Sequence, residues 1–353
     1  MNGARLKLAR VGAGLSLRKL SDEIGSLVSH TKLASCENNN EHLDSRSLMA
    51  VCLRLGINED YLLGKDEISL EGVEWRKNRI TSRREEAQVE SVVIDRLQRY
   101  LNVEELLNIS SRTWARPKGI KKVNELLDAE TAANELRKRW DVGNNPIFGL
   151  GEFLEEKGIK VLKVKLPTSV SGLTCWATSI DGEKSPVIII NEENTGERIR
   201  FTMAHELGHM ILDCSKHANE EKVAHRFAGA FLMPGAPIRK EVGTHRQSIE
   251  MAELFELKQV YGVSVQALAY RLKDLGIISR ATLGSLFDEF EELGYRTPPY
   301  REPNPIKVES IDRFKRLCIR AFSEKAIDEA KVASLLGVKL SVLDEILGPP
   351  QAR

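Results

Sequence analysis

Five consecutive residues in the middle of the chain, His205 to His209, have the order H-E-x-x-H. On a helix, His205 and His209 lie one turn apart on the same face, so their imidazoles can bind one Zn²⁺. Glu206 projects beside them and can take a proton from an attacking water molecule. The plain alternative is a structural pair of histidines on an amphipathic helix, because so short a pattern also arises by chance. The surrounding sequence must therefore supply the rest of a zinc site.

A catalytic zinc ion needs three protein ligands and one open position, and the two histidines supply only two. Apolar residues recur at helical spacing from about Glu197, which predicts a helix that contains the motif. A second helix is predicted to begin at the N-cap Asn219 and to end at Pro234. Two acidic residues, Glu220 and Glu221, stand in the first turn of that second helix. Either carboxylate would complete a His₂Glu ligand set.

The apolar face of the second helix favours one of the two carboxylates. Glu221 precedes Ala224 by three residues and Ala228 by seven, so it lies on the inner face of the helix. Glu220 points about 100° away from that face. We predict a site for Zn²⁺, with Mn²⁺ as the alternative ion, formed by both histidines and Glu221.

The segments RFTMAHELGHMILD and EEKVAHRFAGAFLMP resemble the metallopeptidase domain of the ImmA/IrrE family. That family pairs an H-E-x-x-H helix with a second helix bearing E-x-x-A-x-x-F-A. The resemblance implies that His205, His209 and Glu221 are metal ligands and that Glu206 is the catalytic glutamate. It also implies that the substrate is another protein, a repressor or antitoxin with its own helix-turn-helix.

Strand-like segments before the motif predict an α+β domain. IKVLKVKLP, from position 159, alternates apolar and polar residues as a strand does. SGLTCWATSI follows as a second strand, and PVIIIN is a third strand after a turn. We expect a small antiparallel sheet packed on the zinc helix, within a zincin-like metallopeptidase domain over 121–295. His245, Arg246 and Tyr270 are candidates for stabilising the oxyanion, although no motif supports them.

The segment 1–65 predicts a compact N-terminal unit of five helices. Ser16 and Ser29 are N-cap candidates for the second and third helices, Gly25 ends the second, and Ser45 or Ser47 starts the fourth. A helix, a glycine turn and a second short helix with polar side chains form the helix-turn-helix plan.

This unit resembles the lambda-repressor-like (Xre) DNA-binding family through GLSLRKLSDEIG, VSHTKLASCENN and LMAVCLRLGINEDYLLG. The resemblance implies that it binds a double-stranded DNA operator through Arg18, His30, Thr31, Lys32, Ser35 and Asn38. Two features favour an alternative role in protein docking or dimerisation. Ser26 and Leu27 lengthen the turn, and nine Lys and Arg against seven Asp and Glu leave only +2 over 1–65.

The other segments are predicted to be helical. Residues 66–120 have the apolar spacing of a helical linker, and 303–353 form a small C-terminal helical unit after the proline-rich linker RTPPYREPNP. The whole chain is therefore expected to be mainly α, with one small α+β domain.

Composition indicates in which cellular compartment the protein is expected. A net charge of +1 favours no class of partner, and no apolar run approaches the roughly eighteen residues of a membrane span. The N-terminus lacks the apolar core of a signal peptide. Five cysteines without a C-x-x-C pair fit a reducing cytoplasm, and Cys214 is more simply a plain thiol than a metal ligand or redox switch.

Together these features predict a cytoplasmic, bacterial-type regulator, with a homodimer as one candidate assembly and no membrane association. It would join sequence-specific DNA binding to zinc-dependent hydrolysis of a partner protein. The alternative is a non-proteolytic transcription factor whose zinc domain senses a metal or a ligand. Glu206 favours catalysis, because a purely structural site does not need a general base.

Overall fold

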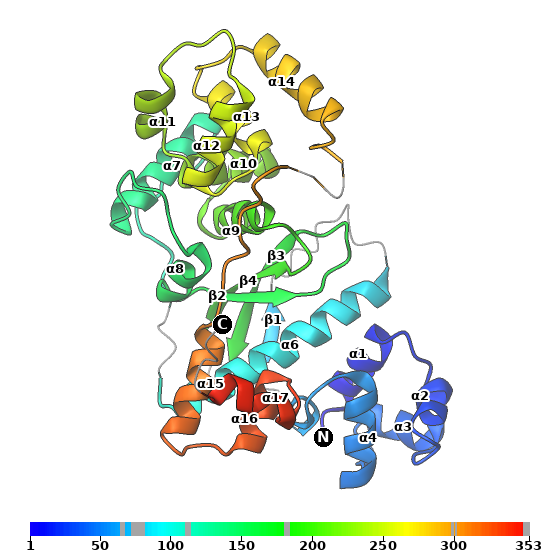
Figure 1. Ribbon diagram of the computed structural model, residues 1–353. Coiled ribbons are helices and arrows are strands. Elements are labelled where there is room, and N and C mark those ends of the chain that lie inside the picture. The colour runs from blue at the N-terminus through cyan, green and yellow to red at the C-terminus, as the bar shows by residue number, and fades with distance from the viewer. Residues whose placement is uncertain are drawn as a thin grey trace. The chain divides into compact units, whose positions relative to one another are not determined.

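A computed structural model of the chain describes residues 1–63, 68–71, 82–109, 114–179, 184–297, 300 and 302–348. They form two compact units, each built from separate segments of the chain. The first unit comprises Met1–Trp114, Glu155–Ile189 and Ile311–Arg353, and the second comprises Ala115–Leu154 and Ile190–Ser310. Helices predominate beside one small sheet, as predicted (Figure 1). The boundaries of the four predicted domains remain predictions.

The first unit begins with the five short helices expected from the sequence: α1 (Gly3–Gly12), α2 (Leu17–Glu23), α3 (His30–Glu37), α4 (Ser45–Leu55) and α5 (Glu59–Leu63). Ser16 and Ser29 cap α2 and α3, since their side chains accept hydrogen bonds from the backbone N–H of the third residue of each helix, Lys19 and Lys32. α4 begins at Ser45, one of the two predicted starts, and Asp44 caps it: its carboxylate accepts hydrogen bonds from both the backbone N–H and the hydroxyl of Ser47.

A long helix, α6 (Arg83–Leu106), packs against α1 within the same unit. The buried Arg5 of α1 donates to the carbonyl of Tyr61 at 3.1 Å and to the side chain of Gln98 on α6 at 3.2 Å. Ile94 of α6 joins the apolar core of the five helices. The N-terminal helices are therefore held to the following helix by both polar and apolar contacts.

The sheet has four strands in the order β1-β3-β4-β2: β1 (Ile68–Glu71), β2 (Lys160–Val164), β3 (Gly172–Ser179) and β4 (Lys184–Asn191). β1 pairs antiparallel with β3, with Ile68 opposite Ser179. This strand lies within the predicted helical linker 66–120, and its four residues are too few to display a strand period in the sequence. Residues 64–67, 72–81 and 110–113 of that region lie outside the described residues.

The sheet is mixed, which corrects the prediction of a purely antiparallel sheet. Only four residues join β3 to β4, too few for a parallel crossover, so that pair is antiparallel. The parallel pair is therefore β2 with β4, which are neighbours although β3 lies between them in the chain. Most of the sheet belongs to the first unit and the motif helix to the second, and their packing remains a prediction.

Three C-terminal helices complete the first unit: α15 (Arg313–Ser323), α16 (Glu329–Leu336) and α17 (Leu340–Leu347). Arg313 of α15 donates to Glu104 of α6 at 2.7 Å, and the same carboxylate pairs with the buried Lys160 of β2 at 2.6 Å. Lys331 of α16 pairs with Asp60 of α5 at 2.6 Å. The C-terminal helices are thus anchored to α5, α6 and the sheet.

The second unit is helical: α7 (Leu126–Arg139), α8 (Leu150–Glu156, whose last turn crosses the unit boundary), α9 (Gly196–Ile211), α10 (Glu220–Leu232), α11 (Gly235–Val242), α12 (Met251–Tyr261), α13 (Val265–Asp274) and α14 (Arg280–Glu292). α10 packs against α9 and against α7. Among the described residues, no helix combines the length and apolarity needed to cross a membrane.

An extended strap, residues 302–310, lies against this unit instead of forming a free proline-rich linker. Glu302 pairs with the fully buried Lys258 at 2.9 Å. The Ile306 N–H donates to Glu197 of α9 at 2.8 Å, and Glu309 pairs with Arg200 of α9. These anchors come from distant segments, so composition alone could not reveal them.

A largely enclosed carboxylate, Glu130 of α7, joins three helices of the unit. It accepts two hydrogen bonds from Arg271 of α13 at 2.7 and 2.6 Å and one from Arg226 of α10 at 3.0 Å. Burial alone would raise the pKa of Glu130, but the hydrogen bonds and charges of Arg271 and Arg226 outweigh it and lower the pKa. Such a depressed pKa means that the ionised carboxylate stabilises the fold.

Replacing Glu130 with Gln should destabilise the second unit by about 3–5 kcal/mol at neutral pH, because Arg271 would remain buried without its carboxylate. Hydrogen exchange of peptides from α7, α10 and α13 measures this unit separately. The difference from wild type should shrink as the pH falls through the lowered pKa of Glu130, where the wild-type carboxyl also becomes neutral.

The matched control is Glu135→Gln on the same helix. Its partner Arg139 lies 3.5 Å away and both side chains are about half exposed, so the loss should stay below about 1 kcal/mol. Equal exchange rates for the two variants would contradict a stabilising role of Glu130.

Candidate metal centre

The predicted ligands lie on α9 and α10, which pack closely side by side. A Cβ atom added at Gly208 would lie 3.0 Å from the Phe227 ring and 3.4 Å from the Cα atom of Ala224. The glycine inside the H-E-x-x-H motif therefore lets the two helices approach. The motif helix is buried along nearly its whole length, so its histidines project from a firmly packed element.

Hydrogen bonds from other segments hold the loop that connects α9 to α10. The Arg116 side chain donates twice to the carbonyl of Ile211 in the last turn of α9, at 3.0 and 2.8 Å. Val123 forms an isolated parallel bridge with Cys214 after that helix ends. The Asn219 side chain caps α10, as predicted, by accepting from the Lys222 N–H at 3.0 Å.

The structure brings His205, His209 and Glu221 together. The two histidine Nε2 atoms lie 3.1 Å apart, and each lies 3.6 Å from an oxygen of Glu221. Tetrahedral Zn²⁺ with bonds of about 2.0–2.2 Å separates its ligand atoms by about 3.4 Å. Spacing and donor types therefore fit a His₂Glu zinc site.

The candidate centre has a buried side and an exposed side. His205 and Glu206 are 3% and 2% exposed, whereas the side chain of Glu221 is 49% exposed. Glu206 follows His205 directly on α9 and is buried on the same helix. Water and substrate would reach the centre from the side of Glu221.

Two alternatives considered from the sequence lie outside this group. Among the described residues, the metal-binding group contains Glu221 but neither Glu220 nor Cys214. Burial raises the pKa of the Cys214 thiol, and the charges of Glu220 and Asp213 raise it further. A thiol that resists ionisation is a poor metal ligand and a slow redox nucleophile.

The three oxyanion candidates are engaged or exposed elsewhere. Arg246 forms two hydrogen bonds with Glu253 at 3.0 and 2.9 Å, and the Tyr270 ring packs on Phe287 with centroids 4.9 Å apart. His245 is exposed in the connection between α11 and α12. Their catalytic role remains a prediction without geometric support.

His225 was not predicted from the sequence, yet it lies beside the ligand group. Its ring centroid is 4.4 Å from that of His205 and 5.8 Å from that of Phe201. It follows Glu221 by four residues, so both side chains project from the same face of α10. The four-residue spacing from Glu221 was the sequence signal that could have identified His225.

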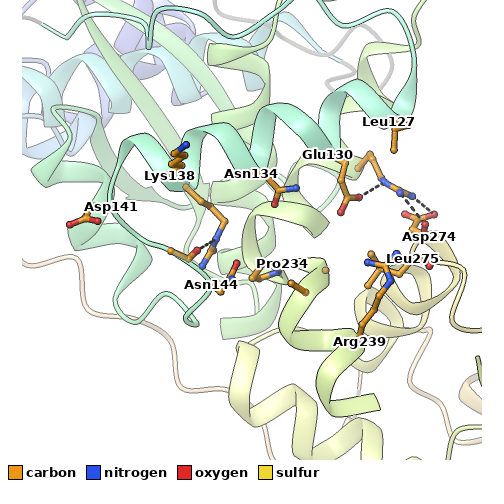
Figure 2. A pocket seen from close by; sticks show the side chains of 15 residues that line it. Leu127, Glu130, Asn134, Lys138, Asp141, Asn144, Pro234, Arg239, Asp274 and Leu275 are labelled. Carbon is orange, nitrogen blue, oxygen red and sulfur yellow. Dashed lines mark hydrogen bonds and ion pairs between the residues drawn. The ribbon is translucent and has the colours of Figure 1, made fainter. Parts of the chain in front are cut away.

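A cavity of about 600 Å³ in the same unit is lined by polar and apolar residues of α7 and the loop after it, of α10 and α11, and of the end of α13 (Figure 2). Its lining includes Glu130 and Arg226 but none of the three ligands. The buried Arg137 of this lining donates to the carbonyls of Gly143, Phe231 and Asn145, which fix a loop and the end of α10. We interpret these contacts as structural.

The predicted DNA-binding residues lie on or beside α2 and α3. Leu33 and Cys36 of α3 are buried, and the side of the helix facing away from them carries Thr31, Ser35 and the C-cap Asn38. His30, Lys32 and, on α2, Arg18 complete the set: His30 and Arg18 are exposed and Lys32 is half-buried.

The longer turn between α2 and α3 is an ordered feature. Gly25 and Ser26 have left-handed backbones, and the Ser21 hydroxyl donates to the Val28 carbonyl at 2.6 Å. Binding of DNA by this surface remains a prediction.

Comparison with known families finds a match over part of the chain. Residues 154–273 match the family described as Peptidase_M78, IrrE N-terminal-like domain, and this segment contains both site helices. The match supports a peptidase domain of the regulatory IrrE and ImmA type. It does not extend to the N-terminal helices, and no curated protein or solved structure matches the chain.

The geometry predicts about one Zn²⁺ or Mn²⁺ per chain. Alanine at His205, His209 or Glu221 should abolish retention of the ion, because two remaining ligands bind it too weakly. Metal content after dialysis, determined by mass spectrometry, measures retention. Glu220→Ala is the matched control one residue away and should keep the ion, as should Glu206→Gln. Loss of metal from Glu220→Ala with retention in Glu221→Ala would reverse the ligand assignment.

Proposed function

We propose that the chain is a cytoplasmic regulator that hydrolyses a partner protein at this centre and binds operator DNA through its N-terminal helices. The observation that carries the peptidase activity is the set of three ligand atoms 3.1–3.6 Å apart, two of them on the helix where the buried Glu206 follows His205. The family match over 154–273 supports the reaction class. A repressor or antitoxin with its own helix-turn-helix is the proposed substrate.

His205, His209 and Glu221 would hold Zn²⁺, with Mn²⁺ as the alternative ion. When bound, the ion supplies Lewis-acid chemistry that makes water more acidic and polarises a carbonyl group. Burial of His205 keeps its imidazole in one orientation, while the exposed Glu221 leaves an approach for the substrate.

Glu206 would act as the general base and acid. Its carboxylate takes a proton from the attacking water and delivers it to the nitrogen of the leaving amine. Burial at 2% exposure excludes bulk water from this carboxylate and restricts its positions. Proton transfer within a fixed, dry site requires little reorganisation.

The N-terminal helices would bring the peptidase to its regulatory partner at DNA. The side of α3 facing away from Leu33 and Cys36 offers hydroxyl and amide groups, and the exposed His30 and half-buried Lys32 add an imidazole and an ammonium group. Such groups are suited to base edges and phosphates. Homodimerisation would match a palindromic operator, as helix-turn-helix proteins commonly require.

Glu206→Gln distinguishes a peptidase from a sensor. The amide keeps the size of the side chain and the metal ligands but removes the general base, so turnover should fall about 10²–10⁴-fold. Purified metal-loaded protein and candidate helix-turn-helix proteins encoded near its gene would be incubated together, and cleavage followed by mass spectrometry. Within cells, the variant should leave the target intact and its genes uninduced.

The result that would contradict proteolytic regulation is a metal-loaded Glu206→Gln protein with a wild-type response in cells. That outcome would support the alternative, a transcription factor whose metal domain senses a metal or a ligand.

DNA binding is tested separately on α3. His30→Ala or Lys32→Ala should weaken specific binding by about 1–3 kcal/mol if the side chain contacts a base. Affinity for a selected operator would be measured by fluorescence anisotropy at several salt concentrations, and it should fall steeply with salt. Lys7→Ala, exposed on α1, is the control. Unchanged binding after replacement of residues 29–36 would favour a protein-docking role.

A further inference from the structure

We propose that His225 donates a hydrogen bond to the scissile carbonyl oxygen as that oxygen gains negative charge. This inference rests on the proposed peptidase function and deepens it by naming a catalytic residue. His225 belongs neither to the ligand group nor to the motif, and its position became evident only from the pairing of α9 and α10.

Helix geometry places His225 at the edge of the ligand group. Glu221 and His225 are one turn apart on α10, and Phe201, His205 and His209 are successive turns of α9. His209 and His205 both lie 3.6 Å from Glu221, whereas His225 contacts His205 and Phe201. His225 therefore lies next to the ligand group, in the same interface between α9 and α10.

The environment of His225 suits a donor that substrate can reach. The residue is exposed, like Glu221, whereas His205 and Glu206 are buried. Its ring is inclined by 50° to the His205 ring and by 37° to the Phe201 ring, so two aromatic neighbours limit its orientation. A donor already held in place stabilises developing charge without reorganisation.

Hydrogen-bond donation is consistent with either charge state of His225, since neutral imidazole carries one N–H and imidazolium carries two. No proton needs to be transferred in this step. The hydrogen bond strengthens as the carbonyl oxygen becomes an oxyanion, so it stabilises the transition state more than the bound substrate.

The competing explanation is that His225 only packs against His205 and orients it. Two substitutions separate these roles. His225→Phe keeps an aromatic ring between His205 and Phe201 but removes the N–H donor. His225→Gln removes the ring but keeps a side-chain N–H. Because His225 is exposed, neither change should disturb the core, and His225→Leu is a second variant without a donor.

The first measurement is hydrolysis of a randomised fluorogenic peptide library by the metal-loaded, full-length protein. His225→Phe should lower kcat by about 10²–10³-fold with little change in KM, as expected when one oxyanion donor is removed. His225→Gln should stay within about tenfold of wild type. Metal content should be equal in all variants. A Phe variant as active as wild type, or less impaired than the Gln variant, overturns the proposal.

The second measurement is independent of turnover. Acetohydroxamate binds metal centres through its oxygen atoms, and its affinity for the Co²⁺-loaded protein is followed by visible absorption. The His225→Phe and His225→Leu variants should bind it about tenfold more weakly than wild type and His225→Gln. If wild type cleaves neither the peptides nor the candidate helix-turn-helix proteins, the peptidase function fails, and this titration separately shows whether His225 donates to an oxygen bound at the centre. Equal affinities in all variants would overturn that role.

Discussion

The register between α9 and α10 is the constraint on which the candidate centre depends. Each residue turns an α-helix by about 100° and advances it by about 1.5 Å. A shift of α10 by one residue would turn Glu221 away from two Nε2 atoms that now lie 3.6 Å from its oxygens. Gly208 maintains this register, because a larger residue would meet the Phe227 ring and the backbone of Ala224.

Ion pairs on the side of α10 toward α7 hold the same helix. Arg226 of α10 pairs with Glu130 and Asp274, at 3.0 and 2.8 Å, while the buried Arg271 of α13 donates to both oxygens of Glu130. Ionised groups removed from water are tolerated only with well-placed partners, so few alternative positions satisfy all these pairs at once. Apolar contacts on the α9 side and ion pairs on the α7 side thus position one helix between them.

Local sequence patterns predicted the ligands because helical periodicity relates neighbouring residues. His205 and His209 share a turn, and the inner face of the next helix favours Glu221, which the structure places beside them. The four-residue spacing from Glu221 to His225 is visible in the sequence, but the sequence does not show that this face of α10 meets His205 of α9. The strand β1 is likewise recognisable only with its distant partner, since Ile68 pairs with Ser179. Tertiary contacts of this kind leave no periodic pattern in the sequence. For the same reason the sequence suggested Arg246 as an oxyanion donor, although its side chain pairs with Glu253.

The ligands differ in how firmly the protein holds them, and this difference determines how metal binding couples to the fold. His205 and His209 project from a helix that is buried along nearly its whole length, whereas Glu221 stands half exposed in the first turn of α10. First turns lack the full set of helical hydrogen bonds, so here the Asn219 cap and the Val123–Cys214 bridge supply part of the order. An ion bound by all three ligands would therefore add its stabilisation mainly at the start of α10, by joining it to the rigid motif helix. Since His225 lies on the next turn, ordering of Glu221 would also order the side chain proposed to meet the substrate.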